Sequence, residues 1–384
     1  MSTTVPYSLE DVNSFVEALG QLIDPRDPRG KRHGLAFILA AVVLGILSGR
    51  SKVSSLHRFI GNRLAWLRAV TNQPHAQAIS RAHLPRLLAR VDWTALNTLV
   101  EAYFGIQLER DTNQAWVAVD GKTLRGTVGS GEPQAVVLAV SHQRRIVLAQ
   151  APMNGPKASE IVVVRTLLAD SKLEAQKVSL DAHHCNPKTT AQIHQAGGEF
   201  VLQVKANQPT LLKHCQRVAA PTPARAGHVE HTKDHGRLTT RQSQGFSLAS
   251  CPLAKRWANS GLQTLVVVER HPQPPATGKT SSDTAYYLSN RALSQAPKRH
   301  LKELTGAIRQ HWHVESDNWI RDVTFNEDQI KIRSPNQAQV MGGLRGLAMR
   351  LLRKANVGNF QAALENFVDC PSTFQRFLKK VKFL

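Results

Sequence analysis

Cysteine is scarce in this sequence and shows no paired spacing. The four cysteines are scattered along the chain at Cys185, Cys215, Cys251 and Cys370. A chain of 384 residues is long enough to fold without disulfide staples, so this usage fits a reducing compartment. The first residues also lack the basic and apolar regions of a secretory signal. Both absences favour a cytoplasmic protein.

Long hydrophobic runs are also missing. The most apolar stretch, residues 35–49, spans about 15 residues, and a membrane-crossing helix needs roughly 20. We therefore expect this stretch to be a buried helix of a helical domain, and we expect no membrane partner.

Acidic residues are few relative to basic ones. The chain has 49 Lys and Arg against 28 Asp and Glu, a formal net charge of +21. Such a charge attracts polyanions, because each neutralised phosphate releases a counterion. The basic residues are spread along the chain, which predicts basic surfaces on a folded body. Nucleic-acid binding is favoured over the alternative of a merely soluble basic protein.

The chain is long enough for two or three packed units. Residues 1–108 are expected to form a helical domain, because apolar residues recur at three- and four-residue spacing. Residues 301–384 are also expected to be helical. There, Ser334 and Pro335 predict a helix start whose surface carries several basic residues: Arg345, Arg350, Arg353 and Lys354.

Strands are expected between these helical parts. The first part, residues 109–215, has the predicted order β-β-β-α-β-α-β, with strands at 116–119, 135–140, 146–149, 178–180 and 200–204. This order fits a mixed sheet of the ribonuclease-H-like kind better than strict βα alternation. Residues 216–300 are expected to be a β-rich insertion, with strands at 244–248, 265–268 and 286–288. The fold class is therefore mixed α/β with helical ends.

Two carboxylates are placed where this sheet could bring them together. Asp120 and Asp181 each follow a predicted strand, and we expect those strands to be parallel neighbours. Close carboxylates repel unless a cation lies between them, and carboxylate oxygens suit Mg²⁺ or Mn²⁺. A single Asp at a strand end is more often a cap or turn residue. A third carboxylate would favour a site for two metal ions and displacement at phosphorus.

Glu315 is the candidate for that third carboxylate. On a helix it would share a face with His311, Trp312, Asn318 and Trp319. The alternative is an aromatic packing stripe that carries an incidental acid.

Basic and polar residues near these carboxylates are candidate DNA contacts. For Lys122 and Arg125, a solvated loop and DNA contact are equally good interpretations. For Lys205, Asn207 and Gln208 we favour DNA contact. A solvated hairpin is the alternative for the residues in the insertion. The remaining candidates are Lys205, Asn207 and Gln208 after the last core strand, His235, Arg237 and Arg241 in the insertion, and Arg309, His311, Trp312 and Trp319 around Glu315.

Two other motifs fail on spacing. The string Gly121-Lys122-Thr123 ends like a phosphate-binding loop, but Trp116 stands where its first glycine should be. The adjacent residues 183–185 do not match the usual spacings of zinc ligands.

Several strings, in order, resemble one family. They are Val119 to Gly126 (VDGKTLRG), Asp181 to Cys185 (DAHHC), Val204 to Gln208 (VKANQ), His235 to Arg237 (HGR) and the block from His311 to Asp328. Together they resemble the DDE transposases of the ISAs group, which includes the H-repeat-associated proteins. The resemblance covers nearly the whole chain. It implies that residues 1–108 are the group's transposase-associated domain, which is a candidate for binding DNA ends. The chain departs from the family's usual strings at three places, which are Lys157-Ala-Ser-Glu160, Asp317-Asn318 before Trp319, and Thr239.

The resemblance implies a metal-binding triad of Asp120, Asp181 and Glu315 in a bacterial protein. It implies hydrolysis at transposon ends followed by attack of the freed 3′-hydroxyl on target DNA. We expect two Mg²⁺ or Mn²⁺ ions per site, Asp120 bridging them, and a homodimer on double-stranded DNA. The alternatives are a domesticated nuclease that never joins strands and a non-catalytic DNA-binding protein.

Overall fold

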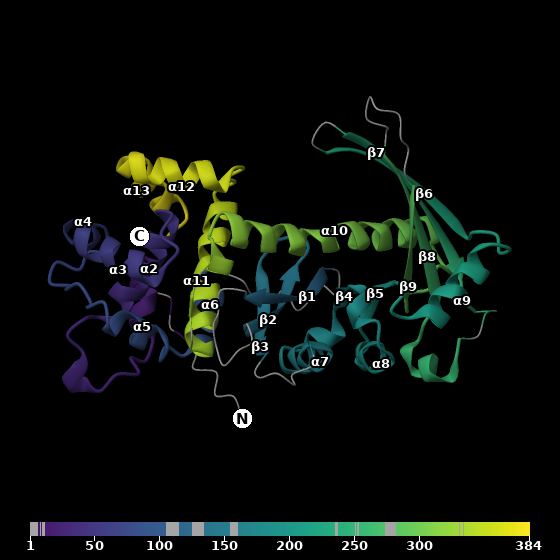
Figure 1. Cartoon of the computed structure of the whole chain (residues 1–384), viewed down its shortest axis with the longest axis horizontal. Coiled ribbons are helices and arrows are strands. Elements are labelled where there is room, and N and C mark those ends of the chain that lie inside the picture. The colour runs from purple at the N-terminus through teal and green to yellow at the C-terminus, as the bar shows by residue number, and fades with distance from the viewer. Residues whose placement is uncertain are drawn as a thin grey trace.

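The computed structural model describes most of the chain. Its described residues are 7, 9, 12–104, 115–124, 134–153, 160–234, 237–249, 251, 253–272, 282–329, 331, 332 and 334–384. The N-terminal helices lie at one end of the molecule and the strands β6–β9 at the other, and one long helix, α10, runs along the sheet between them (Figure 1).

The N-terminal part is helical. Its helices are α1 (Phe15–Ala18), α2 (Leu35–Leu47), α3 (Val53–Asn62), α4 (Leu64–Val70), α5 (His83–Leu88) and α6 (Trp93–Tyr103). Every residue of α2 except Ala36 is buried, which confirms the expected buried helix. At Gly45 a Cβ atom would come within 2.6 Å of the Leu56 side chain, so α2 and α3 pack closely. Within the described residues no helix is both long and apolar enough to cross a membrane.

One mixed sheet of nine strands forms the centre of the molecule. Its order is β3-β2-β1-β4-β5-β9-β8-β7-β6. The β1–β4 and β4–β5 pairs are parallel and the other pairs are antiparallel. The strands are β1 (Trp116–Leu124), β2 (Gln134–Ser141), β3 (Val147–Met153), β4 (Lys177–Leu180), β5 (Glu199–Val204), β6 (Ala226–Asp234), β7 (Arg237–Ser247), β8 (Thr264–Pro272) and β9 (Asp283–Ser289).

The predicted order of the first seven core elements agrees with this sheet, but one strand is longer than predicted and two later elements were missed. β1 does not end at Asp120, because it continues to Leu124 in antiparallel pairing with β2. The sequence analysis also missed β6 and the helix α9 (Pro209–Ala219). The strands of the expected β-rich insertion continue the same sheet, since β9 pairs directly with β5.

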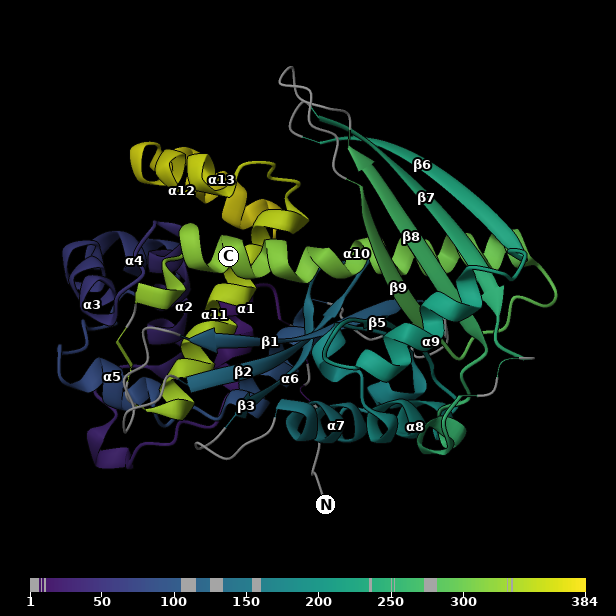
Figure 2. The ribbon, with the colours of Figure 1, turned by 45° about the vertical axis from the view of Figure 1, so that its right-hand side comes forward.

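Helices cover both faces of the sheet (Figure 2). Helices α7 (Glu160–Asp170) and α8 (Pro187–Gln195) pack against one face, where Val117 and Val119 of β1 are buried. Helix α10 (Pro297–Val323) crosses the other face, where Ala118 packs with Val314. Because side chains alternate along a strand, Asp120 belongs to the α10 face with Ala118.

The two helical ends of the chain share one hydrophobic core. The C-terminal helices α11 (Pro335–Lys354), α12 (Phe360–Asp369) and α13 (Pro371–Lys380) pack their apolar residues among those of the N-terminal helices. Ser334 caps α11 through its side chain, as the sequence predicted.

A buried ion cluster joins these layers. Glu327 lies in the short helix η6 (Glu327–Gln329), and its carboxylate is 3.3 Å from Arg345 on α11 and 3.6 Å from Arg321 on α10. Lys122 of β1 lies 3.8 Å from the second carboxylate oxygen and pairs with Asp322. Glu327 and the three cationic residues are at most 5% exposed. Arg345 was expected on the surface of its helix. This is wrong, because its guanidinium group forms an ion pair with the buried carboxylate of Glu327.

Glu327 remains ionised in this cluster. Burial alone would raise the pKa of its carboxyl, but the charges of Arg321, Arg345 and Lys122 lower that pKa below its ordinary value. Arg345 also donates a 3.2 Å hydrogen bond to the carbonyl of Ser51, so the cluster reaches the N-terminal helices.

Removing one partner from such a cluster leaves a buried charge undercompensated. We therefore expect Arg345→Ala to lower the free energy of unfolding by about 3 kcal/mol or more. Urea unfolding of the whole protein measures this change. The exposed Arg376→Ala on α13 is the control and should change stability by less than about 0.5 kcal/mol. Equal stabilities for the two variants would contradict the role of the cluster.

Candidate active site

The parallel pairing of β1 and β4 places the two aspartates. Val119 and Leu180 form the last residue pair of these two strands. Asp120 follows Val119 in the sequence, and Asp181 follows Leu180. There β4 ends, and Asp181 accepts hydrogen bonds from the backbone N–H groups of His183 at 3.0 Å and His184 at 3.3 Å. The expected juxtaposition of the aspartates therefore rests on strand register.

Helix α10 brings Glu315 to the same place. One turn of α10 is fixed on the sheet by Val314, which packs against Ala118, and by Asn318, whose side chain donates a 3.2 Å hydrogen bond to Asp120. Glu315 lies between them, and it lines one small pocket together with Asp181 and Lys205.

Burial and nearby negative charges raise the pKa values of two of these carboxyls. Burial, then the negative charges of Asp181, Glu160 and Glu315, raise the pKa of Asp120 to about 7. The pKa of Glu315 is also raised, first by burial and then by Asp181, although Lys205 opposes the shift. These shifts indicate repulsion between carboxylates that lie close together.

Glu160, at the start of α7, is a fourth carboxylate that the sequence analysis did not assign to the site. It reaches the site from the other face of the sheet, because Gly121 leaves room for it. A Cβ atom at Gly121 would come within 2.4 Å of the Glu160 carboxylate. His184 Nε2 lies 3.0 Å from that carboxylate, and this contact lowers the pKa of Glu160. The only sequence signal was the Lys-x-x-Glu string that ends at Glu160.

The donor set has the chemistry of a site for hard divalent cations. Mg²⁺ and Mn²⁺ prefer carboxylate oxygens, and a cation would relieve the repulsion that raises the pKa of Asp120. No three His, Cys, Asp or Glu side chains of the described residues already surround one point as metal ligands. The carboxylates therefore fit such ions by type, and side-chain rotation would have to bring them together.

For Lys122, DNA contact and a solvated loop were equally good interpretations, and its burial fits neither of them. It is only 5% exposed and is paired with Asp322 and Glu327. Its partners are about 200 residues away in the chain, so no local pattern shows the burial.

Asn207 and Gln208 follow β5, but their side chains bind the protein itself. Asn207 donates to the carbonyl of Ala182 at 2.6 Å, and Gln208 donates to the carbonyl of Cys185 at 3.0 Å. Both bonds hold the turn that begins at Asp181. They position that aspartate, which argues against the expected DNA contact.

His311 is also turned inward. Its Nδ1 atom lies 2.8 Å from the hydroxyl of Ser179, which lies 2.8 Å from His142 Nε2. Burial is the largest cause that lowers the pKa of His311 to about 4 and that of His142 to about 3. Both rings are therefore neutral at pH 7. This series of hydrogen bonds connects α10 to β4 just below Asp181, so the Nδ1 atom of His311 is engaged within the protein.

The other expected DNA contacts differ in their surroundings. Lys205 is exposed, and Trp312 and Trp319 are 40% and 62% exposed on α10. Arg309 pairs with Glu230, and Arg241 donates to Thr232 at 2.6 Å. Arg309, Arg241 and Trp312 line a groove between α10 and strands β6–β8. Arg125, His235 and the side chain of Arg237 lie outside the described residues.

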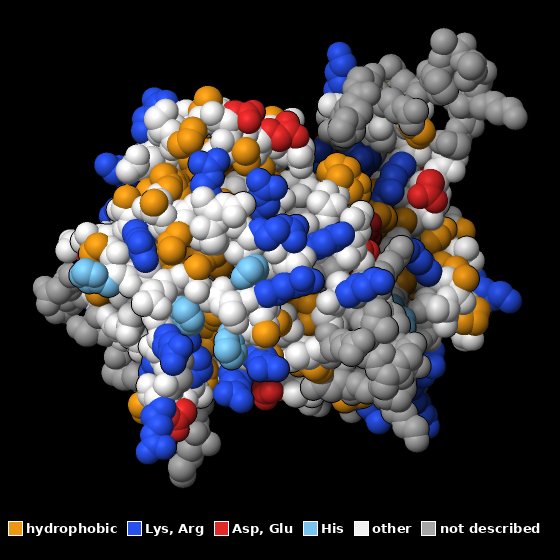
Figure 3. Space-filling view, turned by 60° about the vertical axis from the view of Figure 1, so that its left-hand side comes forward, with side chains coloured by type: hydrophobic (Ala, Val, Ile, Leu, Met, Phe, Trp, Pro, Cys, Tyr) orange, Lys and Arg blue, Asp and Glu red, His pale blue; other side chains and the backbone are white. Residues whose placement is uncertain are grey.

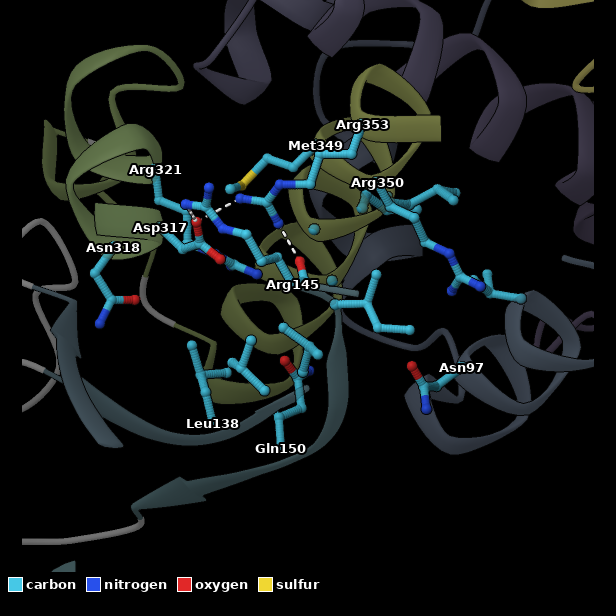
Figure 4. A pocket seen from close by; sticks show the side chains of 18 of the residues that line it. Asn97, Leu138, Arg145, Gln150, Asp317, Asn318, Arg321, Met349, Arg350 and Arg353 are labelled. Carbon is cyan, nitrogen blue, oxygen red and sulfur yellow. Dashed lines mark hydrogen bonds and ion pairs between the residues drawn. The ribbon is translucent and has the colours of Figure 1, made fainter. Parts of the chain in front are cut away.

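A second pocket lies beside the site and includes Asp317, one of the departures from the family's strings. Asp317, 5% exposed, accepts a 2.5 Å bond from Arg145 and pairs with Arg353 on α11 (Figure 4). Arg353 also donates to the backbone carbonyl of Arg145. These bonds tie α10 to the turn between β2 and β3, one residue from Asn318.

Comparison with known proteins identifies the family of this chain. The profile of the family described as "Transposase DDE domain" matches residues 114–351, and one described as "DDE_Tnp_1-associated" matches residues 16–104. The chain therefore belongs to the family of transposase DDE domains, and the predicted family is confirmed.

Relatives from Escherichia coli support the assignment. "Putative transposase YncI" of strain O157:H7 is 26% identical over 354 residues, covering 89% of this chain and 88% of that protein. "H repeat-associated putative transposase YhhI" of strain K12 is 27% identical over 281 residues, covering 69% and 70%. "Putative protein YbfL" of strain K12 is 24% identical over 391 residues, covering 97% and 98%.

The raised pKa of Asp120 makes stability depend on pH when divalent ions are removed. The folded protein keeps a proton on Asp120 up to about pH 7, whereas an unfolded Asp releases it near pH 4. This contribution to stability is therefore complete below about pH 4 and lost as the pH rises through 7. Asp120→Asn should be more stable than the unmodified chain at pH 8, by on the order of 2 kcal/mol, and less so at pH 5.

Urea unfolding with a chelator at pH 5 and pH 8 tests this expectation. Asp369→Asn, an exposed aspartate at the end of α12, is the control. A stability difference that does not grow between the two pH values would contradict the crowding of charge at Asp120.

Proposed function

We propose that this protein is a DNA transposase that cleaves DNA at transposon ends and joins the freed ends to target DNA. In the first step, water attacks a phosphodiester, a new P–O bond forms, and the 3′-oxygen leaves as a hydroxyl. In the second step that 3′-hydroxyl attacks a phosphodiester of the target, whose own 3′-oxygen leaves. Family membership supports a transposase, and the carboxylate geometry supports this reaction.

One observation carries the proposal. Asp120 and Asp181 follow the last residue pair of two parallel strands, and α10 brings Glu315 over the same strands. The charges of Asp181 and Glu315 raise the pKa of Asp120, and the charge of Asp181 raises the pKa of Glu315, which supports a shared site. Three carboxylates carried by neighbouring elements of a protein of net charge +21, one of them with a strongly raised pKa, favour a functional role over a purely structural one.

We assign the metal ligands from this arrangement. Asp120, Asp181 and Glu315 would hold Mg²⁺ or Mn²⁺, two ions per site, with Glu160 as a further ligand from α7. When bound, such ions stabilise the charge that builds on the phosphoryl oxygens. Asn318 keeps Asp120 in place, and the bonds from Asn207 and Gln208 keep the turn of Asp181 in place. Lys205, exposed beside Glu315, is placed to contact a phosphate.

Double-stranded DNA is the partner that the family implies, both as transposon end and as target. We further propose that two copies act together on DNA, because coupled cleavage of two ends needs two active sites. A nuclease of the same fold would cleave without joining. A DNA-binding derivative of a transposase would bind without cleaving.

The central experiment uses labelled DNA that carries the element's terminal repeats, with Mg²⁺ or Mn²⁺. Asp120→Asn and Glu315→Gln should each reduce the cleavage rate by at least about a hundredfold, because each removes charge that holds the ions. Binding of the same DNA should be retained. The control is Asp369→Asn, which lies far from these carboxylates in the sequence and on the surface.

The products separate the three interpretations. Cuts at the repeat ends with joined products on target DNA are expected. Cuts without joined products would indicate the nuclease, and tight binding without cleavage in either metal would rule out the enzyme.

Glu160 has a test of its own. If it is a metal ligand, Glu160→Gln should weaken Mn²⁺ binding by about tenfold or more. Paramagnetic titration of the free ion measures this without DNA or turnover. Glu365→Gln, an exposed glutamate on α12, is the control. Unchanged Mn²⁺ affinity in Glu160→Gln would leave Glu160 as a structural partner of His184 alone.

A further inference from the structure

The N-terminal helices carry a basic groove far from the carboxylates in the sequence. It has a volume of about 690 Å³ and runs between residues 26–33 and residues 77–90. Its polar and charged lining residues are Arg26, Arg32, His33, Gln77, Ser80, His83, Arg86 and Arg90. None of them belongs to the site described above.

The sequence around this groove contains no acidic residue over a long span. From Pro28 to Val91 there are 11 Lys and Arg and no Asp or Glu. At the average frequency of this chain, a span of that length would contain about five acidic residues. In Figure 3, which turns this end of the molecule forward, Lys and Arg side chains are spread over the surface and few acidic ones lie among them.

The cationic side chains of the groove are exposed. Arg32, Arg86 and Arg90 all face solvent. Within the part of the chain that the structure describes, no carboxylate lies within 4 Å of any of these three guanidinium groups. Three unneutralised arginines around one groove repel one another, which favours an anionic occupant.

The two walls are held at a fixed separation. Arg26 pairs with Asp24 at 2.6 Å and donates to the carbonyl of His33. His33 Nδ1 in turn lies 3.2 Å from the carbonyl of Gln77 on the opposite wall. Arg26 therefore shapes the groove, and Arg32, Arg86 and Arg90 supply its charge.

The groove is also attached to the catalytic part. Asn336, near the start of α11, donates hydrogen bonds to the carbonyls of Ala89 at 2.8 Å and Val91 at 3.0 Å. The same helix carries Arg345 of the buried ion cluster. A molecule held in the groove is thereby held at a defined position relative to α10.

We propose that this groove binds the sugar-phosphate backbone of duplex DNA and supplies a second contact besides the active site. Arginine forks match phosphate oxygens, and contacts of this kind fix position and orientation without reading sequence. An acidic protein fits less well, because protein interfaces are anchored by exposed apolar and aromatic residues. Here Ile79 and Leu87 of the lining are only 2% exposed. The inference rests on the proposed function in taking DNA as the partner.

The test measures binding without catalysis. The full chain is titrated onto a fluorescein-labelled duplex of about 30 base pairs, with a chelator and at several salt concentrations. Arg86→Gln with Arg90→Gln should weaken binding by about tenfold or more near 0.1 M salt and reduce the salt slope by about 2. Arg86→Lys with Arg90→Lys keeps the charge and should keep most of that slope, which separates charge from a folding defect.

A matched pair of cations serves as the control. Lys213 and Arg217 are exposed and four residues apart on α9, at the other end of the molecule (Figure 1). Lys213→Gln with Arg217→Gln should leave duplex affinity within about twofold of the unmodified chain, as expected for cations that touch no phosphate.

Each outcome bears on the proposal. Equal affinity in the groove variant and the unmodified chain, or an equal loss in both pairs, would overturn it. An acidic peptide that competes while the duplex does not bind would also overturn it and indicate a protein partner. If the unmodified chain cleaves DNA and the groove variant binds DNA normally, the proposed function stands and DNA binding by the groove is rejected. If binding depends on the groove but the unmodified chain cleaves no DNA, DNA binding by the groove stands and the proposed function is rejected.

Discussion

The ion cluster around Glu327 is the constraint on which the arrangement of this protein depends. Its carboxylate meets cations from β1, α10 and α11 at once, and Arg345 extends the contact to the backbone of the N-terminal helices. Lys122 is two residues from Asp120, and Arg321 is six residues from Glu315. The cluster therefore fixes the strand and the helix that carry two of the three candidate ligands, at a place where solvent cannot screen the charges.

Contacts of two further residues fix α10 along its length. The Asp317 pairs with Arg145 and Arg353 bind it to the β2–β3 turn and to α11, and His311 binds it to Ser179 on β4. Glu315 lies between these points. Its exposed side chain is thus carried by a rigid stretch of backbone, which is the condition for a carboxylate to hold a ligand with defined geometry.

Local patterns in the sequence predicted much of this structure. The order of core strands and helices, the parallel neighbours that carry Asp120 and Asp181, and the Ser334 start of α11 follow from periodicity, strand ends and capping. β6 was missed because His228, Glu230 and Thr232 give it a polar pattern at the edge of the sheet. The burial of Lys122 and Arg345 and the approach of Glu160 to Gly121 depend on partners distant in sequence, so no local pattern could show them.

The acid-free span from Pro28 to Val91 has a consequence for how copies of this protein meet. Its apolar residues fill the interior of the N-terminal helices, so its Lys and Arg side chains are left on the outside. The span itself supplies no acidic residue to neutralise them. Two such surfaces repel when they approach in dilute salt. A polyanion between these ends would offset that repulsion. Encounter of two copies without DNA is therefore electrostatically discouraged at these ends.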